Sequence, residues 1–270
     1  MNAITLVAIS SVVVFLVFAD SCCRINLRDP PGYELIRSKV RSEKIILSTR
    51  NVQSLEKCMD FSVSKKALAF NYGRVDESIN ANSNTTETSR ANDAFCEALQ
   101  CPETNLKFMK NDTNYQYYSM YPINITSSNG NVECVPKAGL FLFSNVTLNY
   151  TDARAYCKKF NASLAHVISD ERSSGFAEFI SDKTPSFVGL SNLDNDRLWK
   201  NEFGEPLDCF DYRAWGPGEP SHSRGCVGIT RLPGSKSLSF WKVLPCKLSF
   251  RFICEIFPYK KSSSAKQKEI

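Results

Sequence analysis

The residues best suited to chemistry are concentrated in one polar stretch, residues 191–225. Beside Glu219, this stretch contains six carboxylates, Asp194, Asp196, Glu202, Glu205, Asp208 and Asp211, and five aromatic residues, Trp199, Phe203, Phe210, Tyr212 and Trp215. Carboxylate oxygens can hold a hard cation such as calcium, and aromatic rings can stack on a sugar or anchor a protein partner. The alternatives are a solvated acidic loop and, for Trp215 and Trp241, a small core within the loop. We favour these alternatives.

General acid–base chemistry has few candidates in this chain. It contains only two histidines, His166 and His222. Neither occurs in a G-x-S-x-G, H-E-x-x-H or C-x-x-C context, which are the local patterns of common hydrolases, metalloproteases and redox proteins. The sequence therefore predicts that the protein is not an enzyme.

The elements that must position the polar stretch are visible in the last 120 residues. Thr151 and Asp152 can cap a helix that carries an apolar stripe from Ala153 to Phe160. Ser169 can cap a second helix with acidic residues in its first turn. Four strand-like runs follow, SFVGL, CVGITRL, LSFWKVL and SFRFICEI. In the last run alternate residues are apolar, as in a strand with one buried face. A loop as long as residues 191–225 inside a compact domain is usually functional or disordered.

The order of these elements resembles the C-type lectin-like domain. The resemblance is carried by TDARAYC at 151–157, SLAHVISDERSSGF at 163–176, FVGL at 187–190, WGPGEP at 215–220, GCVGI at 225–229 and a W-x4-C-x7-C pattern from Trp241. It covers residues 137–257 and implies an α+β fold of two helices, short antiparallel strands and a long loop. It also implies two disulfides, Cys157–Cys254 and Cys226–Cys246. Each would add about 2 to 5 kcal/mol to the stability of a small secreted fold.

The same resemblance implies that the usual calcium site of the family is lost. Sugar-binding members supply calcium ligands from a Glu-Pro-Asn motif, a Trp-Asn-Asp motif and a Glu before the third-last cysteine. Here the corresponding residues are Glu219-Pro220-Ser221, Trp241-Lys242-Val243 and Arg224-Gly225. We therefore predict no metal and no cofactor. The residues expected to contact a ligand are Glu219, Ser221, Trp215 and Lys242.

The N-terminal half resembles a PAN/apple-type domain. The resemblance is carried by SLEKCMDFSVSKKALAFNY at 54–72 and FCEALQC at 95–101. It implies a smaller α+β domain over residues 20–110 with a Cys58–Cys96 disulfide. Ser62 and Ala67 occupy positions where two more cysteines are expected. The pairing of Cys22, Cys23, Cys101, Cys134 and Cys209 is left open, and Cys22 and Cys23 near the domain start are the candidate partners of Cys101.

The remaining features favour export. Residues 1–19 have the length and small terminal residues of a signal peptide, and no later run is long enough to span a membrane. All eleven cysteines follow this segment, and six N-x-S/T sequons are glycosylation candidates, at Asn84, Asn111, Asn124, Asn145, Asn149 and Asn161. Cysteines in such numbers are typical of oxidising compartments. We predict a linker at residues 111–136 and a disordered basic tail at residues 258–270.

These features together predict a secreted C-type lectin-like protein that binds carbohydrate through its long loop without the usual calcium site. The alternative is a non-lectin adhesion or matrix protein that uses the loop and the N-terminal domain on protein partners. The net charge of +5 is modest and is spread along the chain except in the tail, so the sequence does not predict nucleic-acid binding.

Overall fold

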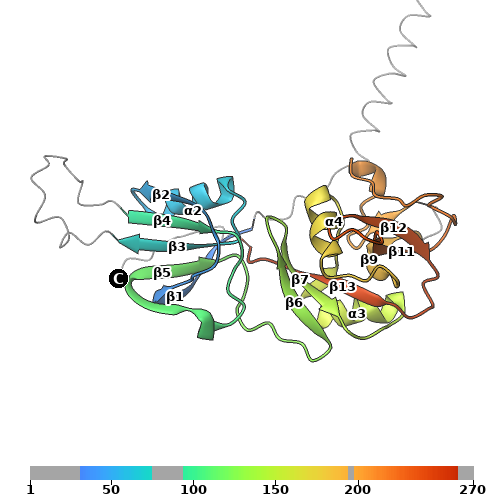
Figure 1. Cartoon of the computed structure of the whole chain (residues 1–270), viewed down its shortest axis with the longest axis horizontal. Coiled ribbons are helices and arrows are strands. Elements are labelled where there is room, and N and C mark those ends of the chain that lie inside the picture. The colour runs from blue at the N-terminus through green and yellow to red at the C-terminus, as the bar shows by residue number, and fades with distance from the viewer. Residues whose placement is uncertain (1–30, 75–93, 194–197, 261–270) are drawn as a thin grey trace, which may run out of the picture.

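The computed structural model describes residues 31–74, 94–193 and 198–260. They form two domains that lie side by side, each built around its own sheet (Figure 1). The predicted signal peptide, the sequon at Asn84, the loop carboxylates Asp194 and Asp196, and most of the predicted tail lie outside the described residues.

The N-terminal domain is a five-stranded antiparallel sheet with strand order β1-β5-β3-β4-β2. Its strands are β1 (Glu34–Arg41), β2 (Ile46–Val52), β3 (Ala69–Arg74), β4 (Ala94–Leu99) and β5 (Lys110–Ser119), with a 3-10 turn η2 (Leu106–Phe108) before β5. Helix α2 (Leu55–Ser64) packs on one face of the sheet. It begins at Ser54, whose side chain accepts a hydrogen bond from Lys57 N, and the Cys58–Cys96 disulfide ties it to β4.

The opposite face of this sheet carries a buried polar network. The amide of Asn71 donates to Glu97 Oε2 over 2.9 Å and to the carbonyl of Ser42 over 2.9 Å. Arg41 contacts the other oxygen of Glu97 at 2.7 Å, and the Ser42 hydroxyl donates to Glu103 over 2.7 Å. Buried polar groups are costly unless they are hydrogen-bonded, so these mutual bonds allow a polar layer inside a small domain.

The predicted linker at residues 111–136 is wrong in most of its length. Residues 110–119 form β5, which lies between β1 and β3, and residues 130–135 form β6, which pairs with β7. The Asn- and Thr-rich composition concealed a strand whose backbone is bonded on both sides and whose Tyr117 is fully buried. Only residues 120–129 connect the last strand of one domain to the first strand of the next.

The C-terminal domain contains an eight-stranded sheet and two helices. The strands are β6 (Gly130–Val135), β7 (Gly139–Ser144), β8 (Ala162–Leu164), β9 (Ser186–Ser191), β10 (Lys200–Asn201), β11 (Cys226–Arg231), β12 (Ser239–Leu244) and β13 (Arg251–Ile256). The main path runs β12-β11-β9-β13-β7-β6, and β10 and β8 pair with β9 and β13. The mixed helix and strand content confirms the α+β class predicted for this half of the chain.

Both predicted helices are present. Helix α4 (Asp170–Ala177) begins at Ser169, as predicted, and the Ser169 hydroxyl accepts from Arg172 N. Helix α3 (Tyr150–Lys159) begins two residues earlier than the sequence suggested, because Asn149 is its cap and accepts from Asp152 N over 2.9 Å. Asp152 therefore lies in the first turn, where its charge favours the helix.

Disulfides reinforce this domain. Cys157 of α3 is bonded to Cys254 of β13, and Cys226 at the start of β11 is bonded to Cys246. These are the pairs that the family resemblance implies. Cys209 of the 3-10 turn η3 (Leu207–Cys209) is disulfide-bonded as well.

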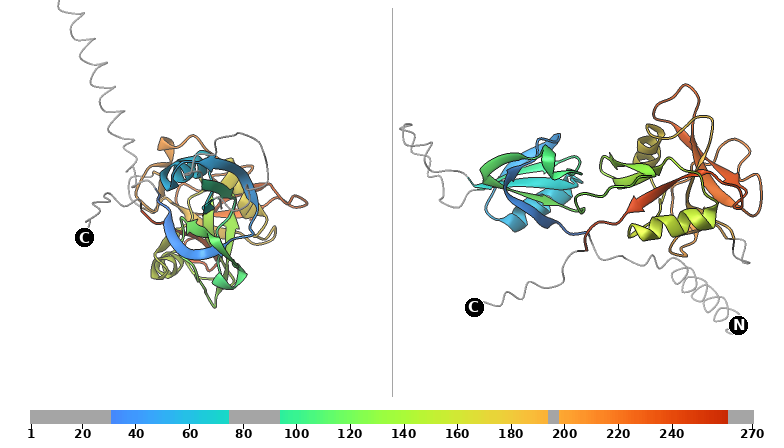
Figure 2. Two further views of the ribbon diagram at one scale, coloured as in Figure 1. Left: turned by 90° about the vertical axis from the view of Figure 1, so that its left-hand side faces the viewer. Right: turned by 90° about the horizontal axis from the view of Figure 1, so that it is seen from below.

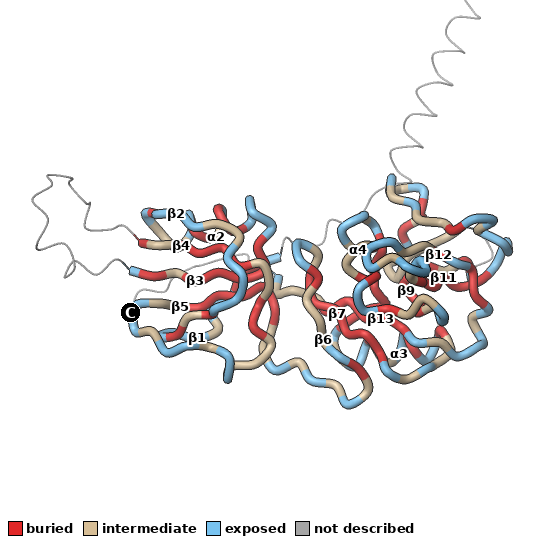
Figure 3. Tube along the Cα trace, viewed as in Figure 1, coloured by how far each residue is buried: buried red, intermediate tan, exposed pale blue. Residues whose placement is uncertain are grey.

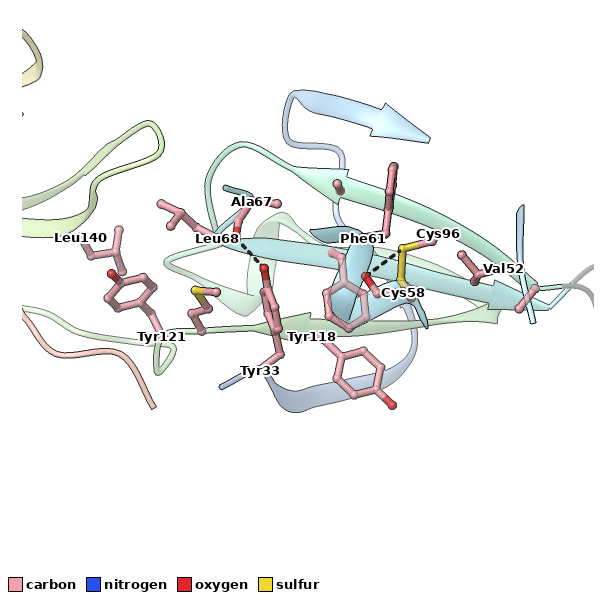
Figure 4. Close-up of a cluster of buried hydrophobic side chains, with 14 of the residues drawn as sticks. Tyr33, Val52, Cys58, Phe61, Ala67, Leu68, Cys96, Tyr118, Tyr121 and Leu140 are labelled. Carbon is pink, nitrogen blue, oxygen red and sulfur yellow. Dashed lines mark hydrogen bonds between the residues drawn. A yellow bond between two sulfur atoms is a disulfide. The ribbon is translucent and has the colours of Figure 1, made fainter. Parts of the chain in front are cut away.

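The two domains are joined covalently and by packing. Cys101, expected to pair near the N-terminus, instead bonds Cys134 of β6, so this disulfide crosses from one domain to the other. One buried cluster runs from Phe61 and Tyr118 of the first domain through Tyr121 to Leu140 of the second (Figure 4). Figure 3 colours the chain by burial, and buried residues, in red, continue from one domain into the other.

The chain returns to this junction after β13 (Figure 2). Tyr259 N donates to the carbonyl of Met120 over 2.7 Å, and Gly32 N donates to the carbonyl of Tyr259 over 2.8 Å. Residues 258–260, predicted to be the start of a disordered tail, are therefore bonded to the first domain. The prediction failed here because the bonds are made by the backbone, which composition does not reveal.

Candidate functional site

The long loop is held against β12 by its own aromatic core. Trp241 is 1% exposed, and its ring packs edge-on against Trp215 and Tyr212, with centroids 5.3 and 5.8 Å apart. Trp199 packs against Trp215 at 5.3 Å. Because these rings contact one another, the structure places Trp215 in the core of the loop.

Backbone bonds attach the same part of the loop to the sheet. Trp241 N donates to Ala214 O over 2.6 Å, and Gly216 N donates to Trp241 O over 3.0 Å. A side chain at residue 216 would clash, since an added Cβ would lie 2.5 Å from the Phe240 ring. Glycine thus permits the loop to approach β12 closely.

Glu219 lies at the end of this attachment, before a cis peptide bond to Pro220. Its Oε2 accepts hydrogen bonds from the backbone N–H of Ser221, over 2.7 Å, and of Val243, over 3.1 Å. Burial raises the pKa of Glu219, but these hydrogen bonds and the nearby Lys242 charge outweigh it and hold the pKa below its ordinary value. The carboxylate therefore bridges the loop to β12.

The other residues of the predicted site lie around this bridge. Ser221 and Lys242 are exposed, and Lys242 alternates along β12 with the buried Trp241 and Val243. The structure thus brings Glu219, Ser221 and Lys242 to one place. The role of the Val243 amide was missed, because a backbone donor has no signature in the sequence.

Arg224, which stands where the family has an acid, closes the base of the loop. Its guanidinium donates to the carbonyl of Leu193 over 2.9 Å. Beside it, Asn192 N donates to Gly225 O over 2.9 Å, and the Asn192 amide donates to Ser223 O over 3.0 Å. Hydrogen bonds therefore close the base of the loop at Arg224 and Asn192.

The described carboxylates of the loop either bind protein groups or lie exposed on the surface. Glu202 accepts from the Tyr150 hydroxyl over 3.0 Å and pairs with Arg154 at 2.7 Å. Glu205 is buried and accepts from the Asn201 amide over 2.6 Å, while Asp208 and Asp211 are exposed. Within residues 31–74, 94–193 and 198–260, no three His, Cys, Asp or Glu side chains are grouped closely enough to hold a metal ion.

The two histidines have different surroundings. His166 is buried, its ring packs edge-on against Phe203 with centroids 4.7 Å apart, and its backbone N–H donates to Glu255 Oε2 over 3.1 Å. His222 is exposed in the loop. The surroundings of His166 suit a role in packing.

Comparison with known proteins agrees with this geometry. Residues 146–256 match the model of the Lectin C-type domain. Human lithostathine-1-alpha is 28% identical over 122 residues, which are 43% of this chain and 70% of that protein. CD209 antigen-like protein D of Mus musculus is 27% identical over 115 residues, which are 43% of this chain and 46% of that protein.

Among solved structures, human lithostathine aligns with 25% identity and a TM-score of 0.39, over 50% of this chain and 91% of that one. In the described residues, no helix is both long and apolar enough to cross a membrane. The family match falls on the domain that contains the long loop, both helices and the Cys157–Cys254 and Cys226–Cys246 disulfides. The C-terminal half of this chain is a C-type lectin domain.

Proposed function

We propose that this chain is an extracellular C-type lectin-like protein that binds carbohydrate through the end of its long loop, without calcium at the family's usual position. The observation that carries the proposal is the bonding of Glu219. Its Oε2 accepts from two backbone N–H groups, and Lys242 lies nearby. An ammonium group beside the carboxylate repels a divalent cation, which supports the absence of calcium at the family's usual position.

The proposed contact surface consists of Glu219, Ser221 and Lys242. The Ser221 hydroxyl, which hydrogen-bonds Glu219, can accept a hydrogen bond from a sugar hydroxyl, and the ammonium of the exposed Lys242 can donate to sugar hydroxyls or acidic sugar groups. In this proposal Trp215 supports the loop from inside, since its ring is packed against Trp199 and Trp241.

The inward packing of the tryptophans also supports the second candidate, a non-lectin adhesion or matrix protein. Sugar-binding sites often offer a flat aromatic face, whereas Trp199 and Trp215 use their rings in the loop core. A protein partner needs no such face and can use the charged rim together with the N-terminal domain.

The N-terminal domain is proposed to be PAN/apple-like, and the whole chain to be exported after removal of residues 1–19. The sheet packed by α2 and the Cys58–Cys96 disulfide support the first point. Several disulfides and the exposed sequon residues Asn111, Asn124, Asn145 and Asn161, with the half-buried Asn149, support the second.

A glycan array separates the two candidates. The full chain should bind a subset of glycans equally in calcium and in chelator. Ser221→Ala and Lys242→Ala should weaken this binding, and Lys183→Ala, an exposed lysine elsewhere in the domain, should not. Binding that chelator abolishes would contradict the calcium-free proposal. Absence of binding to every glycan in both conditions would favour the protein-binding candidate.

A further inference from the structure

A second hollow lies in the N-terminal domain, away from the long loop. It encloses about 320 Å³ accessible to water and is lined by Ser38, Lys39, Tyr72, Arg74, Thr113, Asn114, Tyr115 and Gln116. These residues come from β1, β3 and β5, which are neighbours in the sheet. The space suits a group of the size of one sugar ring.

Strand register explains how the hollow is built. Ser38 of β1 pairs with Gln116 of β5, and Gln116 pairs with Tyr72 of β3. Residues directly opposite in antiparallel strands share a face, so these three side chains form one row. The Tyr118 hydroxyl donates to Gln116 Oε1 over 3.0 Å and fixes the orientation of the Gln116 amide. Within the described residues, the NH2 group of this amide can therefore donate to a ligand.

An irregularity between β1 and β5 opens the hollow. The pairing jumps from Ser38–Gln116 to Val40–Asn111, so residues 112–115 of β5 have no paired residue in β1, although Tyr115 still pairs with Gly73 of β3. Lys39, opposite this bulge, has a φ of 62°, a conformation that is costly for a residue with a side chain. Such bulges redirect side chains out of the regular pleat.

The floor of the hollow beside the bulge is rigid. The Tyr115 ring lies over Gly73, where an added Cβ would come within 2.6 Å of the ring. On the same ring, the Arg41 guanidinium lies 5.1 Å from the centroid. Asp112, the acid of the bulge, accepts from Asn114 N over 3.2 Å and closes the turn.

The charge of the lining is one-sided. Lys39 and Arg74 are both exposed, and in the described part of the chain neither makes a salt bridge. No carboxylate lines the hollow itself, and the nearest acid is Asp112, which lines an adjoining hollow with Lys39 and Thr113. The half-buried Tyr72 adds an aromatic ring, and Ser38 and Gln116 add neutral hydrogen-bonding groups. Two cations beside a ring and neutral donors suit a ligand that has both a sugar ring and an anionic group.

We propose that this hollow is a second binding site, for a sugar ring that carries a carboxylate or a sulfate. Tyr72 contacts the apolar face of the ring, Lys39 and Arg74 bind the anionic group, and Gln116 donates to a hydroxyl. The site is independent of the lectin domain and of the function proposed for its loop.

The test measures binding of the full chain to immobilised dextran sulfate, with unmodified dextran as the neutral reference. Wild type should bind the sulfated polymer and not dextran. Lys39→Ala combined with Arg74→Ala should weaken binding about tenfold, because two charge contacts are lost. Tyr72→Leu, which keeps an apolar side chain against the core, should also weaken it. Hyaluronan in place of dextran sulfate distinguishes a carboxylate preference from a sulfate preference, and binding to either supports the site.

Matched controls make the result decisive. Lys44→Ala combined with Lys183→Ala removes the same charge from exposed positions outside the hollow and should change binding less than about twofold. In a Lys242→Ala background, which removes the loop's own contact with acidic groups, the Lys39/Arg74 double variant should still lose about tenfold in binding, so that loss of the lectin-loop function is recognised separately. The proposal is overturned if the Lys44/Lys183 pair matters as much as the Lys39/Arg74 pair, or if polyglutamate binds as tightly and ignores Tyr72→Leu. Gln116→Ala provides a second probe of the ring site if Tyr72→Leu fails to fold.

Discussion

At the scale of single residues, Glu219 has a structural role in this chain. In this chain its Oε2 takes two backbone hydrogen bonds that hold the loop on β12. These bonds give Glu219 a role that needs no ion, and the neighbouring residues Lys242 and Arg224 are cationic.

The first prediction concerns the response of stability to calcium. The melting temperature should be the same in millimolar calcium and in chelator, because the positions that would supply further ligands carry Lys242, Val243 and Arg224. A functioning site would add about 1 kcal/mol at a calcium concentration about five times its Kd. Glu219→Ala should lower the melting temperature equally in both conditions. A calcium-dependent rise that this variant abolishes would restore the calcium-dependent lectin.

The second prediction concerns the buried ion pair of Arg172 and Glu255. The two are joined at 2.8 and 2.9 Å. Burial raises the pKa of Glu255, but the Arg172 charge and hydrogen bonds outweigh it and place the pKa below its ordinary value. Glu255 therefore stabilises the fold above the pKa it has in the unfolded chain, about 4.3, and this contribution is lost as pH falls through its lower folded pKa.

Arg172→Met should reverse that dependence. Without the guanidinium, burial dominates and raises the pKa of Glu255, so the ionised form is disfavoured at neutral pH. We expect a loss of about 3 to 5 kcal/mol at pH 7, part of which returns as pH is lowered toward 5. Thermal melts across pH 3–8 measure this. If the stability of Arg172→Met decreases as pH is lowered, in parallel with wild type, the proposed stabilisation of Glu255 by Arg172 is wrong.

At the scale of elements, helix α4 meets β6 through Gly175. A Cβ added there would lie 2.2 Å from Cγ1 of Val135, which is 1% exposed and β-branched. Two effects oppose each other: alanine gains about 1 kcal/mol in helix propensity, whereas overpacking costs about 1 to 3 kcal/mol.

The third prediction is that overpacking wins. Gly175→Ala should lower the free energy of unfolding, and combination with Val135→Ala should recover part of the loss attributable to the clash. Denaturant titrations of the single and double variants give the coupling. Ser174→Ala, at the half-buried neighbouring position, serves as the helix-propensity control. Equal behaviour of the two alanine variants would show that α4 can shift without cost.

Helices and strands were predicted correctly where a side chain marks them, as a capping residue or an apolar stripe does. Ser169 identified the start of α4, and the order of motifs identified the lectin fold. β5 was missed because its exposed residues are polar and its stability comes from pairing with two partners. The bridge at Glu219 was missed for a related reason, since its donors belong to the backbone.

At the scale of the whole molecule, the sequence suggested two domains separated by a linker. The Cys101–Cys134 disulfide and the shared cluster around Tyr121 and Leu140 instead hold them together. No sequence pattern shows which cysteine of one domain faces which cysteine of another, and so this pairing could be learned only from the fold.

The fourth prediction is that the domains unfold together while this disulfide is intact. Cys101→Ser combined with Cys134→Ser should lower stability by about 3 to 4 kcal/mol and divide a single thermal transition into two. Protease cleavage within residues 120–129 should become faster. The Cys226→Ser/Cys246→Ser pair, which lies within the lectin domain, should destabilise the protein without exposing that segment. A single transition in the Cys101/Cys134 variant would mean that packing alone couples the domains.

The bonds of Tyr259 with Met120 and Gly32 have a consequence for synthesis of the chain. A ribosome releases the N-terminal domain first, and domains generally fold as they emerge. The backbone groups of Gly32 and Met120 nevertheless find their hydrogen-bond partner only in Tyr259, which is translated after the entire lectin domain. During translation the first domain therefore exposes an unpaired backbone edge while about 140 further residues are made. This edge can pair only after the second domain has been synthesised.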